Sequence, residues 1–157
     1  MRNTRLVVAL VTIAITGLGL GAAAQQKPAA AAAQKITVYK TSSCGCCRLW
    51  VDHLKASGFD VQAMDVSSAD VRAVSKAAGL KDDDTSCHTA KVGNYVVEGH
   101  VPADDIRRML KEKAAIAGIA APGMPQGSPG MEQGSKEPFD VVAFTKDGKT
   151  TVYAKHK

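Results

Sequence analysis

"ITVYKTSSCGCCRLWVDHL", residues 36–54, holds two adjoining patterns that decide the fold. Residues 36–40 are β-branched and aromatic, which is typical of a short strand. From about Cys46 the apolar positions recur at i, i+3, i+4 and i+7, which predicts an amphipathic helix. These positions are Cys47, Trp50, Val51 and Leu54. A strand, a polar turn at 41–43 and a helix therefore follow one another without a break.

The chain then continues to alternate between strand and helix patterns. Further strands are predicted over 59–66, 88–92 and 95–98. A second helix is predicted after the capping Ser67 or Ser68, and a third begins at Pro102, where the missing N–H costs nothing. Gly93-Asn94 separates the last two strands as in a hairpin. The resulting order β-α-β-α-β-β-α is the thioredoxin-like arrangement, so we predict an α/β fold with a thioredoxin-like core.

The C-terminal part of the chain differs in character from this core. Residues 114–138 are rich in Gly, Pro and Ser, contain Met124 and Met131, and have neither a helical nor a strand period. Loops of this length are uncommon inside a compact domain and are usually functional or disordered. Residues 139–144 and 150–154 then predict a β-hairpin. We therefore expect a Met/Gly/Pro loop followed by a hairpin.

The N-terminal residues predict export from the cytosol. Arg2 and Arg5 precede an apolar run over 6–20, and small alanines at 22–24 follow it, which is typical of a secretory signal peptide. We assign residues 1–24 to the signal peptide, 25–34 to a flexible linker and 35–157 to a thioredoxin-like metal-binding domain. The apolar run is shorter than the ~20 residues that span a bilayer, so no stable membrane insertion is expected after cleavage. The expected location is the periplasm.

Charge and composition exclude one class of partner. The formal net charge is +5, or +3 without the two arginines of the signal peptide. Basic residues are spread along the chain and aromatic residues make up only 4 % of it, which argues against nucleic-acid binding.

The four cysteines are the candidate functional residues, and element order predicts that they meet. Cys44, Cys46 and Cys47 lie in the loop after the first strand and at the start of the helix, where the helix dipole stabilises thiolate. Cys87 lies in the loop before the third strand. In a thioredoxin-like core these two loops are neighbours, so all four thiols converge.

The cysteine pattern allows three interpretations. Cys44 and Cys47 form a C-x-x-C pair suited to thiol–disulfide exchange, and four cysteines could also form two structural disulfides. A disulfide within 44–47 closes almost no loop and would stabilise little. An exchange enzyme of this fold also carries a proline before the third strand, where this chain has Ser86-Cys87. The additional thiol of Cys46 therefore favours the third interpretation, a metal site.

Thiolate ligands favour soft or borderline metals. Such a set selects Cu(I), Zn(II) or iron–sulfur centres, and iron–sulfur assembly is not expected in an exported protein. Zinc would be satisfied by four cysteines, or by three cysteines and His88. Thioethers at Met124 and Met131 favour Cu(I) instead, and three thiolates from one loop can bridge several Cu(I) ions. Zinc remains the alternative.

At these residues the chain resembles the secreted, thioredoxin-like CopG proteins of copper-resistance loci. The resemblance covers about residues 36–153 and rests on four segments: "SCGCC" at 43–47 followed by Trp50, "SCHTA" at 86–90, "YVVEGHVPADDIRRML" at 95–110 and "PGMPQGSPGM" at 122–131. It implies a periplasmic protein whose cysteines hold a copper cluster. The matching ligands are Cys44, Cys46, Cys47 and Cys87.

The resemblance also implies a role in copper oxidation or reduction. Copper ions are the expected partner, together with another periplasmic copper carrier or exporter. We include His88, Met124 and Met131 among the candidate ligands. His100 follows a glycine near a helix start, where it could serve the site or only position the helix. His53 lies off the apolar face of the first helix and is expected to face solvent.

Overall fold

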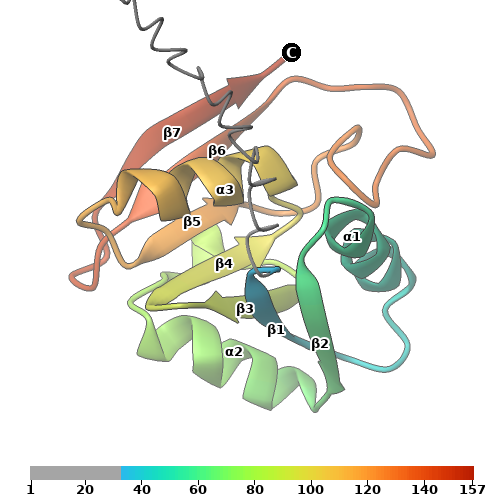
Figure 1. Cartoon of the computed structure of the whole chain (residues 1–157), viewed down its shortest axis with the longest axis horizontal. Helices are drawn as coiled ribbons and strands as arrows, with labels where there is room; N and C mark the ends of the chain where they lie inside the picture. Colours follow the sequence, from blue (N-terminus) through green and yellow to red (C-terminus); the bar gives the residue numbers. More distant parts are fainter. Residues whose placement is uncertain (1–32) are drawn as a thin grey trace, which may run out of the picture. The chain divides into compact units, whose positions relative to one another are not determined.

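The computed structural model describes residues 33–157, which form three α-helices, one short 3-10 helix and one seven-stranded mixed sheet (Figure 1). An α/β fold is therefore confirmed. The predicted signal peptide, and the predicted linker up to residue 32, lie outside the described residues. Within the described part of the chain, no helix has the length and apolar composition needed to cross a membrane.

The elements follow one another as strand and helix up to α3, and three further strands complete the sheet. In chain order they are β1 (Lys35–Lys40), α1 (Gly45–Ala56), β2 (Asp60–Asp65), α2 (Ser68–Ala77), the short 3-10 helix η1 (Asp82–Asp84), β3 (His88–Val92), β4 (Tyr95–Gly99), α3 (Ala103–Glu112), β5 (Gly118–Ala121), β6 (Phe139–Phe144) and β7 (Thr150–His156). The sheet order is β2-β1-β3-β4-β5-β6-β7. Strands β1 and β2 and strands β4 and β5 pair in parallel, and the other pairs are antiparallel.

The two faces of the sheet carry separate apolar clusters. Trp50 and Leu54 of α1 and Ile106 and Met109 of α3 are fully buried in the main apolar cluster on one face. Helix α2 covers part of the other face, where a smaller cluster contains Phe144. The indole Nε1 of Trp50 donates to a backbone carbonyl in the β4–α3 connection over 2.9 Å, which ties α1 to the end of β4.

Strand β5 corrects the prediction that residues 114–138 have no regular structure. The four residues Gly118–Ala121 are buried throughout, so they show no alternation that a period could detect. A side chain at Gly118 would collide with the Val96 carbonyl and the Phe144 ring, so the close approach of β5 to β4 requires glycine there. Strand β5 joins the predicted C-terminal hairpin, β6 and β7, to the rest of the sheet.

Met64 does not belong to the core. It lies on β2, which is the edge of the sheet, and its exposed fraction is 40 %. At this edge only Val61 of β2 packs partly against the core, and the other side chains of the strand are exposed. Met109 of α3, in contrast, is buried.

His53 is half-buried and caps a helix, contrary to its expected exposure. The start of α3 has no capping side chain of its own, because Pro102 precedes it. The Nε2 atom of His53 accepts the backbone N–H of Ala103 over 3.1 Å and so satisfies one of the donors that a helix start leaves free. Burial lowers the pKa of His53 below its ordinary value of 6.5.

We predict that His53 makes the fold sensitive to acid. The unfolded chain protonates this imidazole near its ordinary pKa, whereas the folded chain does so only at lower pH. Its contribution to stability is therefore complete above about pH 6.5 and is lost as the pH falls from there through the lowered pKa. His53→Gln keeps an acceptor for Ala103 but does not titrate.

Between about pH 7.5 and about pH 5, the midpoint of urea unfolding should fall less in His53→Gln than in the unaltered protein. The comparison between the two proteins removes the contribution of other histidines, which are present in both. Equal falls would contradict the prediction.

Candidate metal centre

The cysteine site lies where α1 begins. Cys44 is the N-cap of α1, and its Sγ accepts the backbone N–H of Cys47 over 3.3 Å. Cys46 occupies the first turn, and Cys87 lies immediately before β3. The end of β1 pairs with the start of β3, so the chain leaving β1 toward α1 passes the chain entering β3. All four sulfurs lie within 4.8 Å of one another, as element order predicts.

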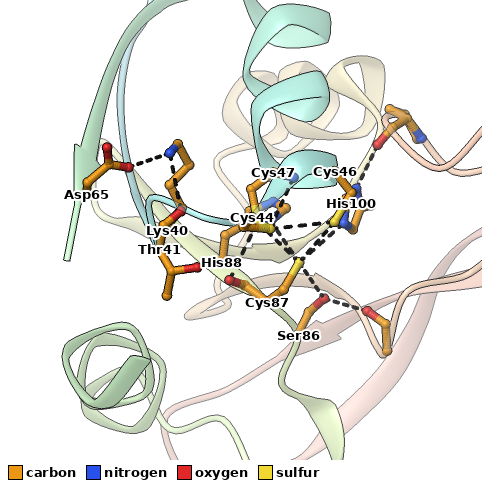
Figure 2. Close-up of a disulfide and its surroundings, with 12 residues drawn as sticks. Lys40, Thr41, Cys44, Cys46, Cys47, Asp65, Ser86, Cys87, His88 and His100 are labelled. Atoms are coloured by element: carbon orange, nitrogen blue, oxygen red, sulfur yellow. Dashed lines mark hydrogen bonds and ion pairs between the residues drawn. A yellow bond between two sulfur atoms is a disulfide. The ribbon is translucent and has the colours of Figure 1, made fainter. Parts of the chain in front are cut away.

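Two of these cysteines form a disulfide (Figure 2). Cys44 is bonded to Cys47, while Cys46 and Cys87 are free thiols. The free sulfurs remain close to the bonded ones: Cys46 Sγ is 3.6 Å from Cys44 Sγ and 3.9 Å from Cys87 Sγ. Cys47 Sγ is 3.4 Å from Cys87 Sγ. Opening this one disulfide would therefore yield four adjacent thiols without a change of fold.

The spacing of these donors fits a small soft cation. A tetrahedral ion with bonds of about 2.3 Å to sulfur and about 2.0 Å to nitrogen holds two sulfurs about 3.8 Å apart, and a sulfur and a nitrogen about 3.5 Å apart. The observed sulfur–sulfur distances of 3.4, 3.6 and 3.9 Å lie near the first value. Apart from the bonded Cys44–Cys47 pair, neighbouring sulfurs are thus spaced as ligands of one ion or as bridges between several.

Two histidines extend the donor set. His88 Nδ1 and His100 Nε2 each lie 3.4 Å from Cys87 Sγ, and both residues are fully buried. His100 Nδ1 donates to the Pro129 carbonyl over 2.8 Å, which leaves Nε2 unprotonated and directed at Cys87. The Nε2 atom of His88 has no hydrogen-bond partner among residues 33–157. The sequence pattern named His88 but left the role of His100 open.

The register of the β3–β4 hairpin indicates that His100 lies beside Cys87. Strand β4 runs antiparallel to β3, with Glu98 opposite Thr89, so the residues after β4 return to the start of β3. His100, which follows β4, is therefore carried to Cys87. Counting the register of the predicted hairpin would have identified it.

Burial keeps the metal-free donors uncharged. Burial, together with the neighbouring Cys46, raises the pKa of the Cys87 thiol to about 12. Burial also lowers the pKa of His88 to about 3 and that of His100 below its ordinary value. These donors are neutral near pH 7, and a thiophilic cation would displace the thiol proton on binding.

The methionine-containing loop, residues 122–131, packs on this site through its backbone. The Gly123 carbonyl accepts a hydrogen bond from Ser86 Oγ, next to Cys87. Gly130 lies so close to α1 that a Cβ there would be 2.8 Å from the Cys46 carbonyl oxygen and 2.9 Å from the backbone nitrogen of Trp50. Of the methionines themselves, Met124 is 53 % exposed and Met131 is partly buried.

Comparisons with known proteins agree with this site. Two solved structures, titled Copper resistance protein copG, Form 1 and Form 2, are similar to the chain over 79 % and 80 % of its length. Their sequence identities are 42 % and 43 %, their TM-scores 0.73 and 0.72, and the chain covers 98 % and 99 % of their lengths. The chain belongs to the CopG family of copper resistance proteins.

Two further comparisons are less informative. Residues 85–131 match a family described as "Protein of unknown function, DUF411". That segment contains Cys87, both buried histidines and the methionine-containing loop. No curated protein matches the chain. The titles of the similar structures name copper resistance, and together with the clustered cysteines they suggest copper binding.

We predict that Gly130 is required for the loop to close on α1. Gly130 (φ +86°) and Gly123 (φ +70°) both have left-handed backbone, where a side chain costs about 1–2 kcal/mol. A Cβ added at Gly130 would also lie less than 3 Å from backbone atoms of α1, whereas a Cβ added at Gly123 would meet no atom within 4 Å. Gly130→Ala should therefore lower the free energy of unfolding more than Gly123→Ala does.

Urea unfolding measures this difference, and limited proteolysis reports whether the loop has lifted. Cleavage within residues 122–138 should increase in Gly130→Ala and change little in the Gly123→Ala control. Similar behaviour of the two variants would show that the close packing on α1 does not hold the loop.

Proposed function

We propose that this protein binds Cu(I) in the periplasm through Cys44, Cys46, Cys47 and Cys87, and so contributes to copper resistance. The observation that carries the proposal is the convergence of four sulfurs within 4.8 Å. Thiolate is a preferred donor for Cu(I), and the titles of the similar structures name copper resistance. Several bridged Cu(I) ions would suit three thiolates that come from one loop. Zinc is the alternative cargo.

A thioredoxin-like core is part of the proposal. The strand order β2-β1-β3-β4, with β1 and β2 parallel and β3 antiparallel to both of its neighbours, supports it. So does the position of the cysteines at the start of α1. The strands β5, β6 and β7 and the methionine-containing loop would then be additions to that core, and a signal peptide over residues 1–24 would direct the protein to the periplasm.

The disulfide suggests how the site could change the oxidation state of copper. Cys44 and Cys47 cannot bind copper as thiolates while they are bonded to each other, so loading requires a two-electron donor, such as an external dithiol that leaves as its own disulfide, to open the bond. In the reverse direction, the two thiolates could deliver one electron each to two Cu(II) ions. The products are two Cu(I) ions and the Cys44–Cys47 disulfide, which balances the electrons.

Other residues would complete the site. The neutral imidazole of His88, beside Cys87, is a proposed further ligand. Met124 and Met131 are proposed as thioether ligands or as a route for copper transfer, because the backbone of their loop already contacts the site. A periplasmic copper carrier or exporter would exchange copper with the protein.

A second function, thiol–disulfide exchange, is favoured by one observation. The Cys44–Cys47 disulfide lies at a helix start, where the leaving thiolate would be stabilised. This function requires turnover in an insulin-reduction assay without metal, abolished by Cys44→Ser. Ser86 and Cys87 occupy the place where an exchange enzyme of this fold carries a proline, which makes copper binding the better-supported function.

We predict that the reduced protein takes up at least one Cu(I) ion per chain, and that Cys87→Ser lowers this ratio. A serine oxygen is a poor donor for Cu(I) and does not bridge ions as a thiolate does. Anaerobic reconstitution followed by metal analysis gives the ratio, and a value above one indicates a cluster. Ser43→Ala alters an exposed neighbour of the site and should leave the ratio unchanged.

Two results would overturn this assignment. One is reduced protein that takes up no copper. The other is an unchanged ratio in Cys87→Ser. Reconstitution in the presence of both metals distinguishes copper from zinc, because the bound metal is then identified directly.

A separate prediction concerns the methionines. If Met124 or Met131 supplies a thioether ligand, its replacement by Leu should weaken Cu(I) retention against a competing chelator by about 10-fold or more. Met64→Leu is the matched control, since Met64 is similarly exposed but lies on β2. Retention equal to that of the control in both loop variants would exclude a ligand role for this loop.

A further inference from the structure

Glu98 has a fully buried carboxyl group that accepts a hydrogen bond from the loop segment preceding Cys87 and, among residues 33–157, pairs with no cation. It lies on β4 and its exposed fraction is 0 %. Its Oε1 accepts the backbone N–H of Ser86 over 2.7 Å. Its Oε2 accepts hydrogen bonds from the hydroxyl groups of Ser75, over 2.9 Å, and of Thr89. Among the described residues 33–157, no Lys, Arg or His forms an ion pair with it.

A buried carboxyl group without a cationic partner is unfavourable unless its hydrogen bonds serve the structure. Burying a carboxyl group costs free energy that its hydrogen bonds only partly offset, and an apolar residue of similar size would often be more stabilising. Each oxygen of Glu98 has a distinct task. Oε2 joins β4 to α2 and β3 within the core, while Oε1 alone reaches the segment that carries Cys87.

The bond to Ser86 fixes the residue immediately before Cys87. The N–H that Glu98 accepts would be missing if proline stood at that position. The segment also rests directly on β4, because a Cβ at Gly99 would lie 2.8 Å from the Cβ of Ser86. Ser86 Oγ in turn donates to the Gly123 carbonyl. One buried carboxylate thus holds the Cys87 segment, and through it the start of the methionine-containing loop.

We propose that Glu98 is a positioning residue, which acts through Ser86 to hold Cys87 Sγ at the distance from Cys46 and Cys47 that copper binding requires. The inference rests on the proposed copper site. Glu98 itself touches no copper ligand in the cysteine set. Its role resembles that of groups that orient metal ligands from outside the site, whose loss commonly weakens metal binding by about 10–100-fold.

The test uses three substitutions of Glu98. Glu98→Ala removes the hydrogen bonds of both carboxyl oxygens. Glu98→Asp shortens the side chain by one methylene, so that it cannot accept from the Ser86 N–H and from the two hydroxyl groups at once. Glu98→Gln keeps an oxygen that can accept the Ser86 N–H, and it should restore the unaltered behaviour. Ser75→Ala is the matched control, because it removes a hydrogen bond to the same carboxylate on the side away from Cys87.

Two measurements are made on each protein. The first is the rate of alkylation of Cys87 relative to Cys46 in the metal-free, disulfide-containing form, in which both thiols are free. The ratio should rise in Glu98→Ala and Glu98→Asp and stay unchanged in Glu98→Gln and Ser75→Ala. The second is Cu(I) affinity after reduction, by competition with a chelator, which should fall about 10–100-fold in the same two variants.

The possible outcomes separate the two proposals. A purely structural role predicts that Cys46 and Cys87 become reactive together, or that Ser75→Ala behaves like Glu98→Ala; either result overturns the inference, as does an unchanged ratio. If the unaltered protein binds no Cu(I), the proposed function fails, while the alkylation ratio still decides whether Glu98 positions Cys87. If it binds Cu(I) and Glu98→Asp binds equally well, positioning fails and the copper function stands.

Discussion

The antiparallel pairing of β3 with both of its neighbours is the constraint on which the site depends. Pairing with β1 places the start of β3 opposite the end of β1, so Cys87 meets the segment that leads into α1. Pairing with β4 returns the chain after β4 to the same place, which delivers Glu98 and His100. Three separate segments therefore meet at one end of the sheet. A slip of one residue in either pairing would turn these side chains to the opposite face.

Three buried donor residues of this site are uncharged near neutral pH. Raised thiol and lowered imidazole pKa values leave Cys87, His88 and His100 neutral near pH 7. A soft cation would reverse the balance, because the thiolate form that burial disfavours becomes favourable once a metal is bound. The pre-set distances between sulfurs then matter more than the acidity of any one thiol. If the proposed copper site is correct, it would select its metal by geometry and softness rather than by attraction of charge.

Sequence reasoning was able to find the cysteines because it needed only element order. Cys44 to Cys47 and Cys87 lie at the ends of elements with clear periods, and the strand–helix alternation brings those ends together. It missed β5 because four residues buried on both faces have no alternation to detect. It left the role of His100 open and overlooked Glu98, because the positions of both residues follow from the register of the β3–β4 hairpin and not merely from its presence. His53 was assigned to solvent because helical periodicity describes one helix and cannot see the N-terminus of another that packs against it.

In the proposed function, the disulfide and a copper-loaded state would use the same sulfurs. Cys44 and Cys47 are near enough to bond to each other, while Cys46 and Cys87 stay free beside them. A pure exchange enzyme would need no thiols in those two places, and a pure storage site would gain nothing from a pair that closes. The combination is explained if electrons and copper are exchanged at one place. The fixed position of Cys87, held through Ser86 from the buried Glu98, would then keep one ligand in place while the other pair opens and closes.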